Sequence, residues 1–144
     1  MTTDQILIHL SLIPGVGPAK IHTIFNSDRD TLIDIYQYTS SDFINRFGFT
    51  EPIAEKLVAG LQNFSVLEKE YKDACTHDIA IITCLSDLYP SYLKEITVPP
   101  IVLYCRGNPT VLSSKSLAVV GARAANNYGR IVVDAMVPDF VSQG

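Results

Sequence analysis

The sequence is short of positive charge and has no long hydrophobic run. Its 144 residues include 11 lysines and arginines against 15 acidic residues, a formal net charge of −4. Because nucleic-acid affinity is largely electrostatic, this balance excludes a uniformly basic coat and restricts any polyanion site to a local cluster. Unbroken apolar runs such as residues 79–82 and 117–120 are far shorter than the roughly 20 residues of a membrane span.

Signals for export, disulfide bonds and metal binding are also missing. The first five residues lack the basic start and long apolar stretch of a signal peptide, so we expect a cytoplasmic protein. The cysteines, an odd number without C-x-x-C spacing, favour neither a disulfide scaffold nor a zinc knuckle. The three histidines share no ligand spacing. The sequence therefore predicts no metal and no cofactor.

Charge and composition change near residue 70. Residues 1–70 hold five basic and nine acidic side chains, whereas residues 71–144 hold six of each. The first part has apolar residues at helical spacing, with Asp4 as a possible cap of the first helix, and the second has short Val- and Ile-rich runs separated by prolines. We therefore expect an α+β protein, with a helical domain over 1–70 and the start of an α/β domain over 71–144.

A proline–glycine segment over residues 12–20 separates the first two predicted helices. Gly15 and Gly17 permit a tight hairpin, and N–H groups at the start of the second helix can face a phosphate. This pattern resembles the helix-hairpin-helix motif of DNA-binding proteins, and Gly48 fits a degenerate second copy, as in SAM-like domains. Two interpretations stay open: a DNA contact through Gly15, Gly17 and Lys20, or a turn that serves structure or protein docking in an acidic region.

The second part predicts strands over residues 79–83, 101–105 and 116–120, and a helix that begins near residue 126. Pro138 should kink or end that helix. Gly121-Ala122-Arg123 joins the third strand to the helix, but the pattern is not the G-x-G-x-x-G dinucleotide fingerprint. An arginine at the end of a strand, beside a helix amino terminus, can bind a single phosphate. The alternative is an ordinary surface arginine.

Four segments occur together in a recognisable order. They are Tyr89-Pro90-x-x-Leu93-Lys94-Glu95-Ile96, then Pro99-Pro100-x-x-Leu103-Tyr104-x-x-Gly107-Asn108, then residues 118–123, then Tyr128-Gly129-Arg130. This order resembles the DNA-processing protein A family (DprA, also called Smf). The resemblance implies a helical amino-terminal domain followed by an extended Rossmann-like domain. It also implies a non-catalytic cytoplasmic homodimer that binds single-stranded DNA and helps load RecA in natural transformation, or competence, and DNA recombination.

The same resemblance implies the site residues. The family's G-S-R segment falls on Gly121, Ala122 and Arg123, where the arginine and the turn amides would hold a DNA phosphate. The family's S/T-x-Y-G element falls on Asn126, Asn127, Tyr128 and Gly129. Ala122 lacks the serine hydroxyl, and Asn126 replaces a hydroxyl residue, although asparagine also caps helices.

The family continues with a second strand that carries an S-G-x-A-x-G-I-D element, whereas this sequence ends at Gly144, where that strand is expected to begin. We therefore expect a fragment without most of the DNA-binding domain. Two other classes of function are compatible with the residues. One is a nucleotide-binding enzyme of the phosphoribohydrolase kind, for which no glycine-rich phosphate loop or catalytic carboxylate is present. The other is a protein-interaction module built on the acidic helical half.

Overall fold

The computed structural model describes residues 1–29 and 31–142, and the chain forms two compact units, Met1–Ser113 and Ser114–Gly144. Gln143 and Gly144, where the next strand is expected to begin, lie outside the described residues. The change of composition near residue 70 falls inside the first unit, because the strands that follow it pack on the helices that precede it. The division into domains after residue 70 stays a prediction.

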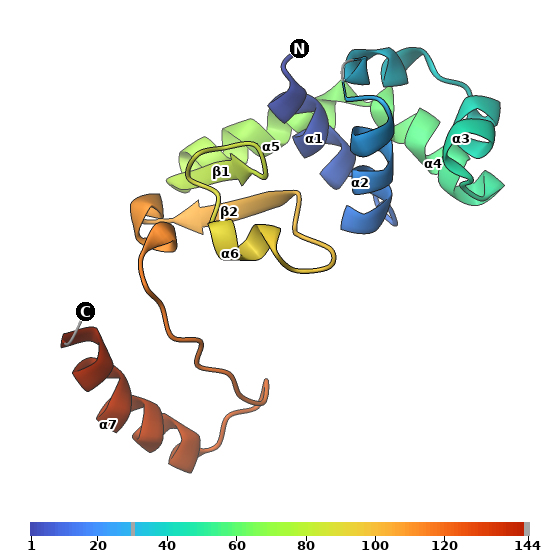
Figure 1. Cartoon of the computed structure of the whole chain (residues 1–144). Helices are drawn as coiled ribbons and strands as arrows, with labels where there is room; N and C mark the ends of the chain where they lie inside the picture. The colour runs from blue at the N-terminus through green and yellow to red at the C-terminus, as the bar shows by residue number, and fades with distance from the viewer. Residues whose placement is uncertain (30, 143–144) are drawn as a thin grey trace. The chain divides into compact units, whose positions relative to one another are not determined.

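The first unit begins with a bundle of short helices (Figure 1). Its elements are α1 (Thr3–Ser11), α2 (Pro18–Ser27), the 3-10 helix η1 (Leu32–Gln37), α3 (Ser40–Phe47), α4 (Glu51–Leu61) and α5 (Phe64–Thr76). The cap of α1 is Thr2 and not the predicted Asp4, because Thr2 and Gln5 form a reciprocal capping box. Asp4 lies in the first turn, and its carboxylate accepts a hydrogen bond from the Thr83 hydroxyl.

Apolar stripes of these helices form one core. On α2, the predicted Ile21, Ile24 and Phe25 are buried, and Phe43 of α3 and Leu57 of α4 are completely covered. These residues belong to a cluster that also includes Leu7, Leu10, Ile13, Val16, Ile35 and Ile101. Such burial supplies most of the stability of helices this short, because each is marginal alone.

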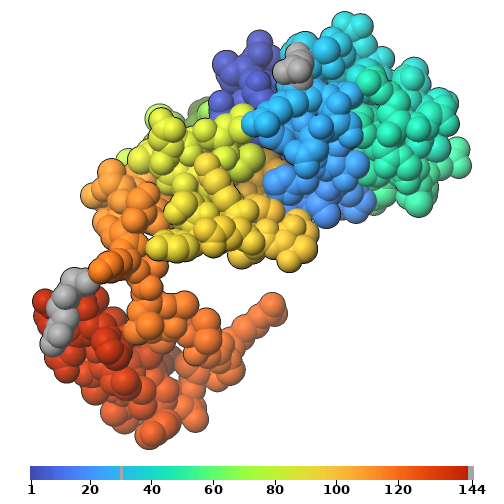
Figure 2. Space-filling model, in the orientation of Figure 1, coloured from blue at the N-terminus to red at the C-terminus, as the bar shows by residue number. Residues whose placement is uncertain are grey.

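A two-stranded antiparallel sheet completes the first unit. Strand β1 (Ile79–Thr83) pairs with β2 (Val102–Arg106), with Ile79 opposite Arg106 and Thr83 opposite Val102. The connection carries the short helix α6 (Ser91–Lys94), and a 3-10 turn, η2 (Pro109–Ser113), follows β2. In the space-filling view, residues near 90–100 lie directly against α2 (Figure 2), where His22 Nε2 is 2.8 Å from the Pro99 carbonyl oxygen. The α+β class is confirmed, and so are the strands predicted over 79–83 and 101–105, the second displaced by one residue.

The second unit contains one helix and no strand among its described residues. The strand predicted over 116–120 is wrong for this structure: Val119 and Val120 are 58% and 90% exposed, and residues 114–126 contain neither strand nor helix. A strand needs a neighbouring strand to satisfy its N–H and C=O groups, and no described segment pairs with this one.

Helix α7 (Asn127–Ser142) confirms the predicted helix start. One of the two effects predicted for Pro138 was that the helix would end near Val137. The helix instead continues through the proline to Ser142. None of its described side chains is buried within the structure.

Candidate nucleic-acid interface

The first candidate site is the turn that leads into α7. Gly121, Ala122 and Arg123 are all exposed, and the turn is bent at Arg123. The guanidinium forms no ion pair with any carboxylate in the part of the chain that the structure describes. Arg123 is therefore open to an anion from solvent, as the sequence-based hypothesis requires.

Asn126 caps the helix that follows this turn. Its Oδ1 atom accepts a hydrogen bond from the Gly129 N–H at 2.9 Å, and its carbonyl oxygen accepts one from the Arg130 N–H at 3.3 Å. The capping role predicted for this asparagine is confirmed. It leaves the N–H groups of Asn127 and Tyr128, which have no helical acceptor, for water or an anion.

Tyr128 presents its ring to solvent. The side chain is 74% exposed, in the first turn of α7 and close in sequence to the capping asparagine. An exposed aromatic ring in the first turn of a helix with free N–H groups is a surface on which a nucleic-acid base can stack. The structure thus brings Asn126 and Gly129 together through the cap hydrogen bond. Arg123 precedes Asn126 in the sequence, and Tyr128 follows it.

The second candidate site is the hairpin between α1 and α2. Gly15 has φ +86°, a conformation that side chains rarely adopt, and the Val16 N–H donates to the Ile13 carbonyl oxygen at 3.1 Å. Gly17 is the N-cap of α2, and the Lys20 N–H donates to its carbonyl oxygen at 3.0 Å. The predicted tight hairpin between two helices is therefore present, and Lys20 is half-buried in the first turn of α2.

Sequence reasoning missed a second lysine at this hairpin. The Nζ atom of Lys56, on α4, lies 3.5 Å from the place where a Cβ atom on Gly15 would stand. Lys56 comes 41 positions later in the chain than Gly15, and no local spacing connects the two. The pattern that points to it is the apolar stripe of α4, which packs Gly60, one turn further on, against Ile13 of the hairpin.

Other chemistries find little support. Among residues 1–29 and 31–142, no group of three or more histidines, cysteines or carboxylates is arranged to hold a metal ion. Within the same residues, no helix combines the length and hydrophobicity needed to cross a membrane. His9 is buried inside the bundle, where its ring nitrogens contact the Tyr36 hydroxyl and the Asn63 carbonyl oxygen.

A glycine hairpin in a helical bundle, and an exposed arginine turn before a capped helix, are features of proteins that bind nucleic-acid phosphates. Comparison with known proteins points to DNA processing and recombination. Residues 80–144 match the model of the DNA recombination-mediator protein A family. A stretch of 67 residues is 36% identical to the DNA processing protein DprA of Bacillus subtilis (strain 168). The resemblance to the DNA-processing protein A family is therefore confirmed.

The similarity covers only part of each protein. The aligned stretch is 46% of this chain and 23% of the Bacillus subtilis relative, so the chain spans about a quarter of the curated relative it matches. No solved structure is significantly similar to the chain. The turn at Gly121–Arg123 and the cap at Asn126 lie inside the segment that matches the family, whereas the hairpin at Gly15 and Gly17 lies outside it.

Proposed function

We propose that the chain is part of a DNA-processing protein that binds single-stranded DNA and helps load the RecA recombinase in natural transformation and DNA recombination. The observation that carries the proposal is the family match over residues 80–144, which includes an exposed arginine turn and a capped helix start. A mediator of this kind positions DNA and a partner protein and needs no catalytic group, so we propose that it is not an enzyme.

In this proposal, the DNA-binding residues are Gly121, Ala122, Arg123, Asn126, Tyr128 and Gly129. Arg123 pairs with a phosphate, for which its guanidinium offers two parallel N–H groups. The amides of the turn and of the first helical residues add to the positive field, and the Tyr128 ring stacks on a base. Asn126 and Gly129 act by fixing the start of the helix and leave the contact itself to the neighbouring residues.

The hairpin supplies a secondary DNA contact in the same proposal. Gly15 and Gly17 keep the backbone free of side chains, and Lys20 and Lys56 are the cations near it. We expect the DNA affinity of this hairpin contact to be lower than that of the Arg123 site. The reason is that residues 1–70 carry nine acidic side chains against five basic ones.

The larger architecture is also part of the proposal. We propose that residues 71–144 form the start of a Rossmann-like domain in which residues 116–120 become a strand when neighbouring strands are present. The full-length protein would act as a homodimer in the cytoplasm. The apolar side chains exposed along residues 117–120 and on α7 support the Rossmann-like domain, because an α/β layer buries such positions between sheet and helix.

The test is binding of fluorescein-labelled oligo-dT to the full chain, and to Arg123→Ala, over a range of salt concentrations. We expect Arg123→Ala to weaken binding and to reduce the slope of log affinity against log salt by about one. Arg106→Ala is the matched control, because it removes an exposed arginine outside the candidate site. It should weaken DNA binding less than Arg123→Ala does.

The double variant Lys20→Gln/Lys56→Gln tests the hairpin in the same assay. A loss of salt slope in this variant, with none in Arg123→Ala, would move the interface from the turn to the hairpin. Equal affinity and slope for the parent chain and all variants would discard both sites.

A further inference from the structure

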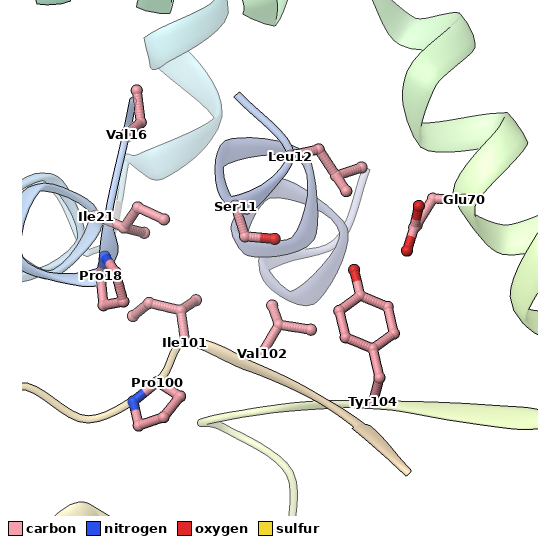
Figure 3. Close-up of a pocket in the computed structure, with 10 residues that line it drawn as sticks. All are labelled: Ser11, Leu12, Val16, Pro18, Ile21, Glu70, Pro100, Ile101, Val102 and Tyr104. Atoms are coloured by element: carbon pink, nitrogen blue, oxygen red, sulfur yellow. The ribbon is translucent and has the colours of Figure 1, made fainter. Parts of the chain in front are cut away.

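A groove runs across the first unit between the α1–α2 hairpin, strand β2 and helix α5 (Figure 3). Its volume is about 350 Å³, enough for one or two amino-acid side chains. All of its lining residues belong to the segment Met1–Ser113, and none is among the DNA-binding residues proposed above. The groove therefore needs an explanation of its own.

One end of the groove is apolar. Its floor is formed by Val16, Ile21 and Ile101, which are 5%, 1% and 2% exposed and belong to the central core. Proline rings from α2 and from the segment before β2 stand beside them (Figure 3). Because the core fixes these side chains, this end is a preformed surface. Its accessible apolar area lies mainly on Leu12, Val102 and the two proline rings, and an aliphatic group would remove that area from water.

The other end is polar and negatively charged. The Tyr104 hydroxyl faces the Glu70 carboxylate (Figure 3), and no described lysine, arginine or histidine lies within ion-pair distance of that carboxylate. Burial, followed by the nearby Glu70 carboxylate, raises the pKa of Tyr104, so its hydroxyl stays protonated and faces the carboxylate. The remaining carboxylate lone pairs, and the electron-rich face of the ring, can receive a cation.

We propose that this groove binds a peptide segment of a partner protein that places an aliphatic side chain next to a lysine or arginine. The aliphatic side chain enters over Val16, Ile21 and Ile101, and the cation reaches Glu70 and Tyr104. Charge complementarity selects this occupant, because the carboxylate at the polar end repels a DNA phosphate, and the acidic surroundings over residues 1–70 attract a basic segment.

Fluorescence anisotropy of the full chain with labelled, capped hexapeptides tests the proposal. The probe is Gly-Ser-Leu-Arg-Ser-Gly, and its two companions carry Ser-Arg or Leu-Gln in place of Leu-Arg. We expect the Leu-Arg peptide to bind most tightly, and each companion to bind about three- to tenfold more weakly. Methyl resonances of Val16, Ile21 and Ile101 should shift on its addition.

The variant Glu70→Gln separates the charge contact from general stickiness. It should weaken the Leu-Arg peptide about three- to tenfold and leave the Leu-Gln peptide unchanged. Glu68→Gln removes the same charge from an exposed position of α5 outside the groove and should change neither affinity.

Three results would overturn the proposal. The first is no saturable binding of the Leu-Arg peptide up to about 1 mM. The second is equal weakening by Glu68→Gln and Glu70→Gln. The third is concentration-dependent self-association of the chain in sedimentation experiments that Glu70→Gln abolishes, because the occupant would then be a second copy of the chain.

Discussion

His9 is a neutral imidazole in the middle of the helical bundle. It is 1% exposed, with Nε2 3.2 Å from the Asn63 carbonyl oxygen and Nδ1 2.9 Å from the Tyr36 hydroxyl. A carbonyl oxygen only accepts, so Nε2 carries the proton, and Nδ1 accepts from Tyr36. The Tyr36 ring stacks on the imidazole and on the Phe64 ring. A second proton on the imidazole would force the Tyr36 hydroxyl to turn from donor to acceptor at Nδ1.

This arrangement predicts that stability falls in mild acid. Burial lowers the pKa of His9 from 6.5, so below pH 6.5 the unfolded chain binds a proton that the folded chain does not. The stability that neutral His9 contributes is fully present above pH 6.5 and is lost as the pH falls toward the lower pKa of the folded state. Urea unfolding at pH 7.5 and 5.5 should show a loss of up to about 1.4 kcal/mol from this group.

Matched histidine variants isolate the cause of that loss. His9→Gln should lower stability at both pH values but reduce the difference between them. His77→Gln replaces an exposed histidine on the carboxyl end of α5 and should keep the difference of the parent chain. The same pH difference in His9→Gln as in the parent would contradict the assignment.

At the scale of elements, the α1–α2 hairpin packs closely against α4 at Gly60, because glycine has no side chain there. A Cβ atom on Gly60 would stand 2.7–2.9 Å from three side-chain carbons of Ile13. Contacts this short do not occur between real side chains, so one of the two elements must move when Gly60 is substituted. The close approach fixes the hairpin, which carries Gly15, against α4, which carries Lys56.

We expect Gly60→Ala to destabilise the chain by about 1–3 kcal/mol in urea unfolding, although alanine is the better helix former. The control is the same substitution in an Ile13→Ala background, which removes the three carbons and should make the added methyl group neutral or stabilising. If Gly60→Ala cost the same in both backgrounds, the clash would not be its cause.

Local patterns predicted the elements better than their partners. The spacing of Ile21, Ile24 and Phe25 predicts the buried face of α2 correctly, and the asparagine before α7 predicts its start. Such features depend on neighbouring residues alone. The Thr2 cap was missed because threonine and aspartate both cap helices, and only the reciprocal bond with Gln5 decides between them.

Long-range relations were not predictable in the same way. The Val- and Ile-rich run over 116–120 has the composition of a strand, but a strand also requires a partner, and the described chain provides none. For the candidate sites, Arg123 followed from an ordered set of motifs. Lys56 did not, because its position beside Gly15 depends on how α4 packs against the hairpin.

At the scale of the whole molecule, burial is concentrated in one of the two units. Every buried residue that the structure describes lies at or before Ile101 in the sequence. Residues 114–126 contain neither helix nor strand, and each of them is exposed. Stability should therefore be uneven along the chain, with a cooperative first unit and a segment after Ser113 that opens at little cost in free energy.

Limited trypsin digestion should reveal this difference. Proteases cleave extended, exposed backbone far faster than helices anchored in a core, so we expect the first cuts after Lys115 and Arg123. Lys20 and Lys56 lie within α2 and α4, and the rate of cleavage after them should be at least about tenfold lower. The surviving fragment should end near Lys115 and keep the urea midpoint of the parent chain, since it retains the whole described core.

The double variant Lys115→Gln/Arg123→Gln should slow its appearance without changing that midpoint. Early cleavage at Lys56, or a fragment that unfolds at much lower urea, would mean that the first unit depends on the residues after Ser113 for its stability.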